Sequence, residues 1–91
     1  MRNYETTILL PGSLSEQQVE EKKAQLQEFF GSEAEIDDQG VQKLAYQIKK
    51  NRDARYLMVR FQSEPADIET LHNKLKLDEG VLRHLIIVPE N

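Results

Sequence analysis

The positive charges of this chain gather between Lys43 and Arg60, and the chemistry they could do is phosphate binding. This stretch holds six Lys or Arg residues and one acidic residue, Asp53, so it carries about +5 in a chain of net charge -4. The remaining residues therefore sum to about -9. Such a separation of sign predicts a polyanion-binding edge, because an arginine fork can bond two phosphate oxygens and a lysine acts as a point charge. A solvated polar hairpin would account for the same charges.

Two predicted strands and a turn between them must position these cations. Residues 40–49 alternate as a half-buried strand does, with Leu44, Tyr46 and Ile48 on one face and Lys43, Gln47 and Lys49 on the other. A turn over residues 50–55 leads into a second apolar run at residues 56–61. The sequence thus predicts a long hairpin with a cationic tip. We expect Tyr46 to pack in the core rather than to stack on a base.

Catalytic and metal-binding patterns are weak. The acidic pairs at 20–21, 37–38 and 78–79 are neighbours in sequence, and such side chains diverge in regular structure. There is no cysteine. His72 and His84 each stand without a nearby His or Cys, so we expect structural roles for both and no metal site. No enzyme, cofactor or small-molecule substrate is expected.

Length and composition favour a small soluble protein. A chain of 91 residues is expected to be one domain, residues 1–91, with a single core. Its 38% hydrophobic and 31% charged residues are typical of a folded domain. No apolar run approaches the length of a membrane span, and no apolar secretory segment follows Met1. We therefore expect a cytosolic protein with no membrane partner.

The elements are predicted in the order strand, helix, strand, strand, helix, strand. Ser15 and Gln18 form a capping-box pattern, which predicts a helix from there to Gly31. Pro65 suits the first turn of the second helix. The predicted strands are 3–10, 40–49, 56–61 and 81–88, and the predicted helices are 15–30 and 65–76.

This order predicts an α+β fold of the ferredoxin-like class, a split βαβ sandwich (βαββαβ). Its four-stranded antiparallel sheet would carry two helices on one face and leave the other face open. The first and third strands should lie in the centre. We also expect these two strands to run parallel, which would bring Arg2 close to Arg55 and to the turn Lys49–Arg52. These residues would then form one basic corner.

The open face is the better candidate for a protein interaction. Tyr56 and Met58 alternate away from Leu57, Val59 and Phe61 on the third strand. If the latter three fill the core, Tyr56 and Met58 must lie on the open face, where apolar side chains often mark an interface.

Several of these residues also carry a resemblance to a known family. The opening Met1–Glu5 and the pattern Gly-x-x-x-Leu-Ala-Tyr-x-Ile-Lys at residues 40–49 resemble the bacterial small-subunit ribosomal protein six family. The similarity continues through Tyr56 and through Val81-Leu82-Arg83 at the last strand, so it covers essentially the whole chain.

The resemblance implies a non-catalytic protein of the cytoplasmic ribosome. Members of this family bind the central domain of small-subunit ribosomal RNA as a heterodimer with small-subunit ribosomal protein eighteen. Matching positions imply RNA contacts at Arg2 and Arg83, while Lys49, Lys50, Arg52 and Arg55 follow from the charge argument. The partner is expected on the open face around Tyr56 and Met58, with the exposed strand edge near Lys43.

Two other classes of protein share this predicted fold. An independent RNA-recognition module has the same element order, but it would place aromatic residues and two glycines on the third strand, where this chain has Met58 at the second aromatic position and no glycine. An engineered or natural ferredoxin-like domain could instead act as a protein-interaction module. Binding measured with and without RNA separates these classes.

Overall fold

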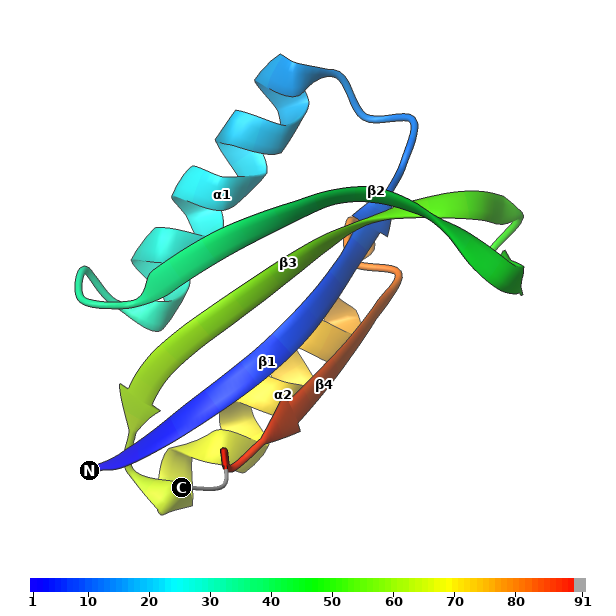
Figure 1. The fold of residues 1–91 in the computed structure, drawn as a ribbon. Coiled ribbons are helices and arrows are strands. Elements are labelled where there is room, and N and C mark those ends of the chain that lie inside the picture. Colours follow the sequence, from blue (N-terminus) through cyan, green and yellow to red (C-terminus); the bar gives the residue numbers. More distant parts are fainter. Residues whose placement is uncertain (90–91) are drawn as a thin grey trace.

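The computed structural model describes residues 1–89, and Figure 1 shows how the elements are arranged. Within these residues the order is strand, helix, strand, strand, helix, strand. The bounds are β1 Arg2–Pro11, α1 Glu16–Phe30, β2 Glu35–Ile48, β3 Asn51–Ser63, α2 Ile68–Leu77 and β4 Arg83–Ile87, with a 3₁₀ helix at Pro65–Asp67 before α2. Neither described α-helix has the length and apolar content needed to cross a membrane.

The strands form one antiparallel sheet in the order β2-β3-β1-β4, and both helices pack on the same face (Figure 1). Leu26 and Phe30 of α1 and Leu75 of α2 meet alternate residues of β1 and β3 in the main core. Those strand residues are Tyr4, Ile8, Leu10, Leu57, Val59 and Phe61. The predicted ferredoxin-like fold, with β1 and β3 in the centre, is confirmed.

The predicted direction of β3 relative to β1 was wrong. The two strands are antiparallel, so Leu10 lies opposite Arg55 whereas Arg2 lies opposite Ser63. The helical crossover makes β1 and β2 parallel, but the β2–β3 hairpin then reverses the chain before β3 pairs with β1. Because Arg55 lies opposite Leu10, the distance from Arg2 to Arg55 along the sheet is the length of strand from Arg2 to Leu10. At the usual rise per residue this is on the order of 27 Å. The expected basic corner of Arg2, Arg55 and the turn therefore does not form.

Local signals set the bounds of α1 as predicted. Ser15 Oγ accepts a hydrogen bond from the Gln18 amide at 3.2 Å, and Gln18 Oε1 accepts one from the Ser15 amide at 2.9 Å. This reciprocal pair satisfies two amides that would otherwise lack partners. The helix ends at Gly31, whose φ of 109° favours glycine. Val19, Leu26 and Phe30 form its buried side.

The β2–β3 hairpin carries a second, smaller core on the face away from the helices. Leu9, Ala54 and Leu82 are buried there, with Leu44, Ile48 and Tyr56 packed against them. Register shifts between Asp38 and Val41 and between Lys43 and Ile48 break the regular alternation of β2. Tyr46 is consequently 71% exposed, so its predicted place in the core was wrong.

The buried hydroxyl group of Thr6 allows the cost of an unpaired polar atom in the core to be measured. Thr6 is fully buried, and its Oγ1 has no hydrogen-bond partner among the described residues. Thr6→Val keeps the side-chain shape and removes this polar atom, so we expect the free energy of unfolding to rise by about 1 kcal/mol. Urea denaturation measures the change. Thr6→Ser, which keeps the hydroxyl and loses the methyl group, should be destabilised; a loss of stability in Thr6→Val would contradict the expectation.

Candidate nucleic-acid interface

The tip of the β2–β3 hairpin is a two-residue turn in an unusual conformation for its side chains. Lys49 and Lys50 have φ values of 47° and 69°, and Ile48 and Asn51 close the turn as a strand pair. A two-residue hairpin turn with positive φ angles at both positions is most often formed by Asn and Gly. Asn51 steadies the turn by donating hydrogen bonds from Nδ2 to the carbonyl oxygens of Ile48 at 3.3 Å and Lys49 at 3.1 Å. Each lysine nevertheless costs roughly 1 kcal/mol there.

The tip presents its cations to solvent. Lys43, Lys49, Lys50 and Arg52 are all exposed, and none of them forms an ion pair with another residue in the range 1–89. Lys43 and Asp53 face each other across the two strands, and Asp53 is the single acidic residue of this segment. The arrangement can attract phosphate without first breaking a contact within the described chain.

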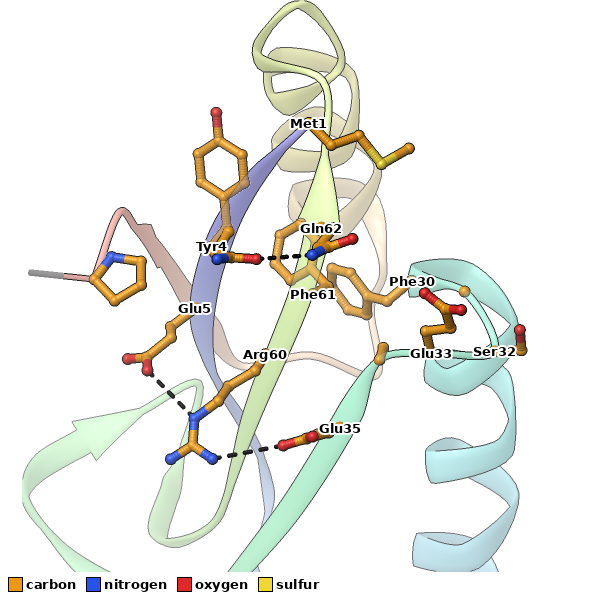
Figure 2. A pocket seen from close by; sticks show the side chains of 14 residues that line it. Met1, Tyr4, Glu5, Phe30, Ser32, Glu33, Glu35, Arg60, Phe61 and Gln62 are labelled. Atoms are coloured by element: carbon orange, nitrogen blue, oxygen red, sulfur yellow. Dashed lines mark hydrogen bonds and ion pairs between the residues drawn. The ribbon is translucent and has the colours of Figure 1, made fainter. Parts of the chain in front are cut away.

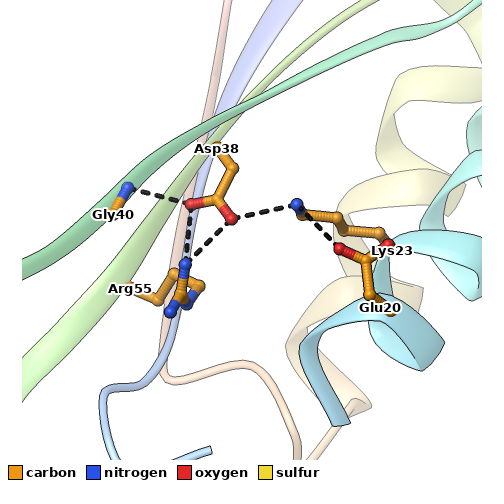
Figure 3. A network of polar contacts seen from close by, with 5 residues as sticks. All are labelled: Glu20, Lys23, Asp38, Gly40 and Arg55. Carbon is orange, nitrogen blue, oxygen red and sulfur yellow. Dashed lines mark hydrogen bonds and ion pairs between the residues drawn. The ribbon is translucent and has the colours of Figure 1, made fainter. Parts of the chain in front are cut away.

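Arg55 is placed differently, because it belongs to a polar network between α1 and the hairpin (Figure 3). Its Nη1 donates to both carboxylate oxygens of Asp38, at 3.1 and 2.9 Å. Lys23 Nζ lies 2.9 Å from Asp38 Oδ2, and the Gly40 amide donates to Oδ1 at 2.9 Å. The Arg55 side chain is only 20% exposed. The structure therefore gives Arg55 a contact within the fold.

The network keeps Asp38 ionised. Partial burial of this carboxylate opposes its charge, but the hydrogen bonds from Lys23 and Gly40 and the charges of Lys23 and Arg55 outweigh that effect. The pKa of Asp38 consequently lies below its ordinary value of 3.8. The hydrogen bond to Asp38 in turn raises the pKa of Lys23. The base of the hairpin is thus tied to α1 by charge-assisted hydrogen bonds.

The two arginines implied by the resemblance lie at opposite ends of the sheet. Arg83 is exposed at the start of β4 and pairs with Leu9, which also pairs with Tyr56 of β3. Arg83 therefore belongs to the same end of the sheet as the base of the hairpin. Arg2 is exposed at the other end, opposite Ser63. Arg83 therefore lies at the end of the sheet from which the hairpin projects, whereas Arg2 lies at the opposite end, far from Arg83 and from the hairpin.

The open sheet face carries apolar side chains on β3 and β4. Tyr56 and Met58 lie on the face away from the helices, as predicted, and both are half-buried. Leu85 and Ile87 of β4 lie on the same face, separated from β3 by Thr7 and Glu5 of β1, and are 64% and 46% exposed. Sequence reasoning missed these two residues, although alternation along β4 could have found them, since His84 and Ile86 occupy the positions between and face the helices.

A hollow of about 600 Å³ near the C-terminal end of α1 offers a different environment (Figure 2). Phe30 and Phe61 line it, and Arg60 crosses its rim between Glu5 at 3.3 Å and Glu35 at 3.7 Å. Two carboxylates hold this arginine, and the Met1 ammonium lies 3.7 Å from Glu64, so the hollow has no free cation among its lining residues for a phosphate. It is therefore a poor candidate for the nucleic-acid site.

The two histidines are in contact, contrary to the expectation that each stands alone. Nε2 of His84 lies 2.9 Å from Nδ1 of His72. Among residues 1–89 no group of three or more His, Asp or Glu side chains is arranged to hold a metal ion. His84 pairs with Ile8, which belongs to the main core, so the pair lies on the helix side of β4.

Comparisons with known proteins agree on one family. The model of the family described as "Ribosomal protein S6" matches residues 3–88. The "Small ribosomal subunit protein bS6" of Natranaerobius thermophilus is 38% identical over 95 aligned positions, which cover 100% of this chain and 99% of that protein. The protein of the same name from Aquifex aeolicus is 38% identical over 93% of this chain and 82% of its own length.

A solved structure supports the fold independently. The crystal structure of 30S ribosomal protein S6 from Thermotoga maritima superposes with a TM-score of 0.84, over 97% of this chain and 87% of that one. The two share 18% sequence identity, so this likeness concerns the fold alone. Since the family model covers residues 3–88 and both of these relatives are 38% identical over most of their length, the chain belongs to the ribosomal protein S6 family.

Proposed function

We propose that this chain binds the central domain of small-subunit ribosomal RNA together with small-subunit ribosomal protein eighteen. As a member of its family it is a structural, non-catalytic protein of the small ribosomal subunit, located on the cytoplasmic ribosome. The proposal goes further and concerns what the chain touches there. Its main RNA surface is the hairpin tip with Arg83, Arg2 makes a separate RNA contact, and its protein surface is the open sheet face.

The conformation of the hairpin tip carries the RNA part of the proposal. Lys49 and Lys50 occupy left-handed positions where Asn and Gly would be better for the fold. Strain kept at exposed residues is typical of positions selected for something other than stability. Two ammonium groups that form no ion pair among residues 1–89, at the end of a projecting hairpin, suit contact with phosphate.

The remaining predicted RNA-binding residues are four arginines, and their positions give them different roles. Arg52 adds to the tip, and Arg83 extends the cationic surface along the same end of the sheet. Arg2 contacts a separate stretch of RNA at the far end. Arg55, although it has the right charge, acts through Asp38 by fixing the base of the hairpin rather than by touching phosphate.

The charge of the whole chain limits how tightly it can bind alone. A net charge of -4 opposes approach to RNA, and the tip and Arg83 together offer few phosphate contacts. A partner that brings further cations removes this limit. The open face supplies its docking site, with Met58 and Tyr56 on β3 and the exposed Leu85 and Ile87 on β4, on the far side of β1. The free edge of β2 near Lys43 continues that surface.

Titration of a central-domain RNA fragment tests the function. The chain alone, protein eighteen alone and the two together are titrated at several salt concentrations. We expect tight, salt-dependent binding only from the pair. Submicromolar binding by this chain alone at physiological salt would instead indicate an independent RNA-recognition module.

A surface variant in the same titration tests the partner site. Met58→Ser with Leu85→Ser should weaken the heterodimer at least tenfold, because both changes remove apolar area from the open face. Leu77→Ser provides the control, since Leu77 is 81% exposed on α2 and lies off that face. Equal affinities in the two variants would place the partner elsewhere.

A further inference from the structure

The contact between His72 and His84 joins the second helix to the last strand of the sheet. His72 lies on α2 and is exposed, while His84 lies on β4 and is half-buried. Nδ1 of His72 and Nε2 of His84 are 2.9 Å apart, and the ring centroids are 4.8 Å apart with an angle of 57° between the planes. The residue opposite His84 on β1 is Ile8, which is apolar. The contact between the two rings is thus a polar contact that joins α2 to β4 beside an apolar strand position.

The spacing of the two nitrogens matches one kind of metal coordination. Imidazole nitrogens lie about 2.0–2.1 Å from a bound transition metal. With the two nitrogens 2.9 Å apart, such bonds meet at the metal at an angle of about 90°. Adjacent positions of a square-planar or octahedral ion have this angle, as Cu(II) and Ni(II) prefer, whereas tetrahedral zinc would need a separation of roughly 3.3 Å.

We propose that His72 Nδ1 and His84 Nε2 form a two-histidine binding site for Cu(II) or Ni(II), with water at the remaining positions. In the hydrogen bond one of the facing nitrogens carries a proton. Metal binding requires both lone pairs, so that proton moves to the other nitrogen of the same ring and two neutral imidazoles bind with no net proton released. A small turn of the rings then brings both lone pairs to the ion.

The site has a consequence for folding, because its ligands come from two different elements. A metal held by both rings ties α2 to β4 and binds the folded chain better than the unfolded one. The melting temperature should therefore rise with metal concentration, on the order of 10 °C when free metal exceeds the dissociation constant one-hundredfold.

Calorimetric titration of the untagged protein tests the site. CuCl₂, NiCl₂ and ZnCl₂ are added separately at pH 7.5 in a buffer that does not bind metals, above the ordinary pKa of histidine. We expect one ion per chain, with affinity falling in the order copper, nickel, zinc. His72→Asn should lower copper affinity at least tenfold and abolish the rise in melting temperature.

A variant without histidine is the control. The chain has two histidines and no cysteine, so His72→Asn with His84→Gln removes every imidazole and leaves carboxylates and the amino terminus. Unchanged copper affinity in this variant, or shifts of only one imidazole in the nickel-perturbed NMR spectrum of the original protein, would overturn the proposal. His72 is exposed, so the single His72→Asn variant decides the matter even if replacement of half-buried His84 impairs folding.

Discussion

Replacing Lys49 with Asn and Lys50 with Gly is expected to make the protein more stable and, at the same time, a weaker RNA binder. Both lysines have positive φ angles in a two-residue hairpin turn. Asn and Gly adopt this conformation at little cost, so the free energy of unfolding should rise by about 1–2 kcal/mol. The same change removes two exposed cations. If both contact phosphate, affinity for the RNA should fall roughly thirtyfold at 0.15 M salt.

Salt titration and urea denaturation of the same preparations measure the two effects. In the plot of log affinity against log salt, the double variant should lose about two units of slope. Lys74→Gln with Lys76→Gln is the matched control, because it removes the same charge from exposed positions on α2. An equal loss of affinity from the control would indicate a diffuse electrostatic effect, and an unchanged urea midpoint in the hairpin variant would mean that the turn stores no strain.

Replacing Asp38 with Ala should destabilise the protein by about 2 kcal/mol. The carboxylate accepts hydrogen bonds from Arg55, Lys23 and the Gly40 amide, and its side chain is 21% exposed. Its removal leaves two partly buried cations without their shared acceptor. Thermal denaturation should show a melting temperature lower by roughly 10 °C. Asp37→Ala removes the same charge at an exposed neighbouring position and should change stability little.

The pH dependence of stability provides a second measure of the same network. Because the pKa of Asp38 is lowered in the folded protein, its contribution to stability is present above the ordinary pKa of 3.8 and is lost as the pH falls through the lower, folded-state value. The stability of Asp38→Ala should therefore approach that of the original protein as the pH falls below about 4. Asp78, whose pKa is also lowered, titrates in the same range in both proteins. A constant difference in stability down to pH 2 would contradict this account.

RNA binding in this protein is expected to depend on the hairpin geometry as well as on its charges. Asp38 binds Arg55 of β3 and Lys23 of α1, and it thereby holds the hairpin against α1. Loss of Asp38 should thus weaken RNA binding indirectly, with little change in the salt slope, whereas loss of Lys49 and Lys50 should reduce the slope itself. The two variants therefore distinguish cations that touch phosphate from the Asp38 network that positions the hairpin.

The sequence by itself determined the order of the elements, the start of α1 and most of the core. Each of these depends on residues within a few positions of one another, as in the Ser15–Gln18 capping box and the alternation of Leu57 and Val59. The predicted turn over residues 50–55 was wrong, because Lys49 and Lys50 form the turn and residues 51–55 belong to β3. The charge count also identified the hairpin tip, because six cations within eighteen residues are visible without any structure.

Only the tertiary structure decided which distant residues meet. The antiparallel pairing of β1 with β3 separated Arg2 from Arg55, a register shift in β2 exposed Tyr46, and the packing of α2 on β4 joined His72 to His84. Periodicity in a sequence defines which face a side chain takes within one element, but a shift of one residue, or a reversal of one strand, changes its neighbours without changing that period. Contacts between elements are therefore settled by the packing of the whole sheet and its helices.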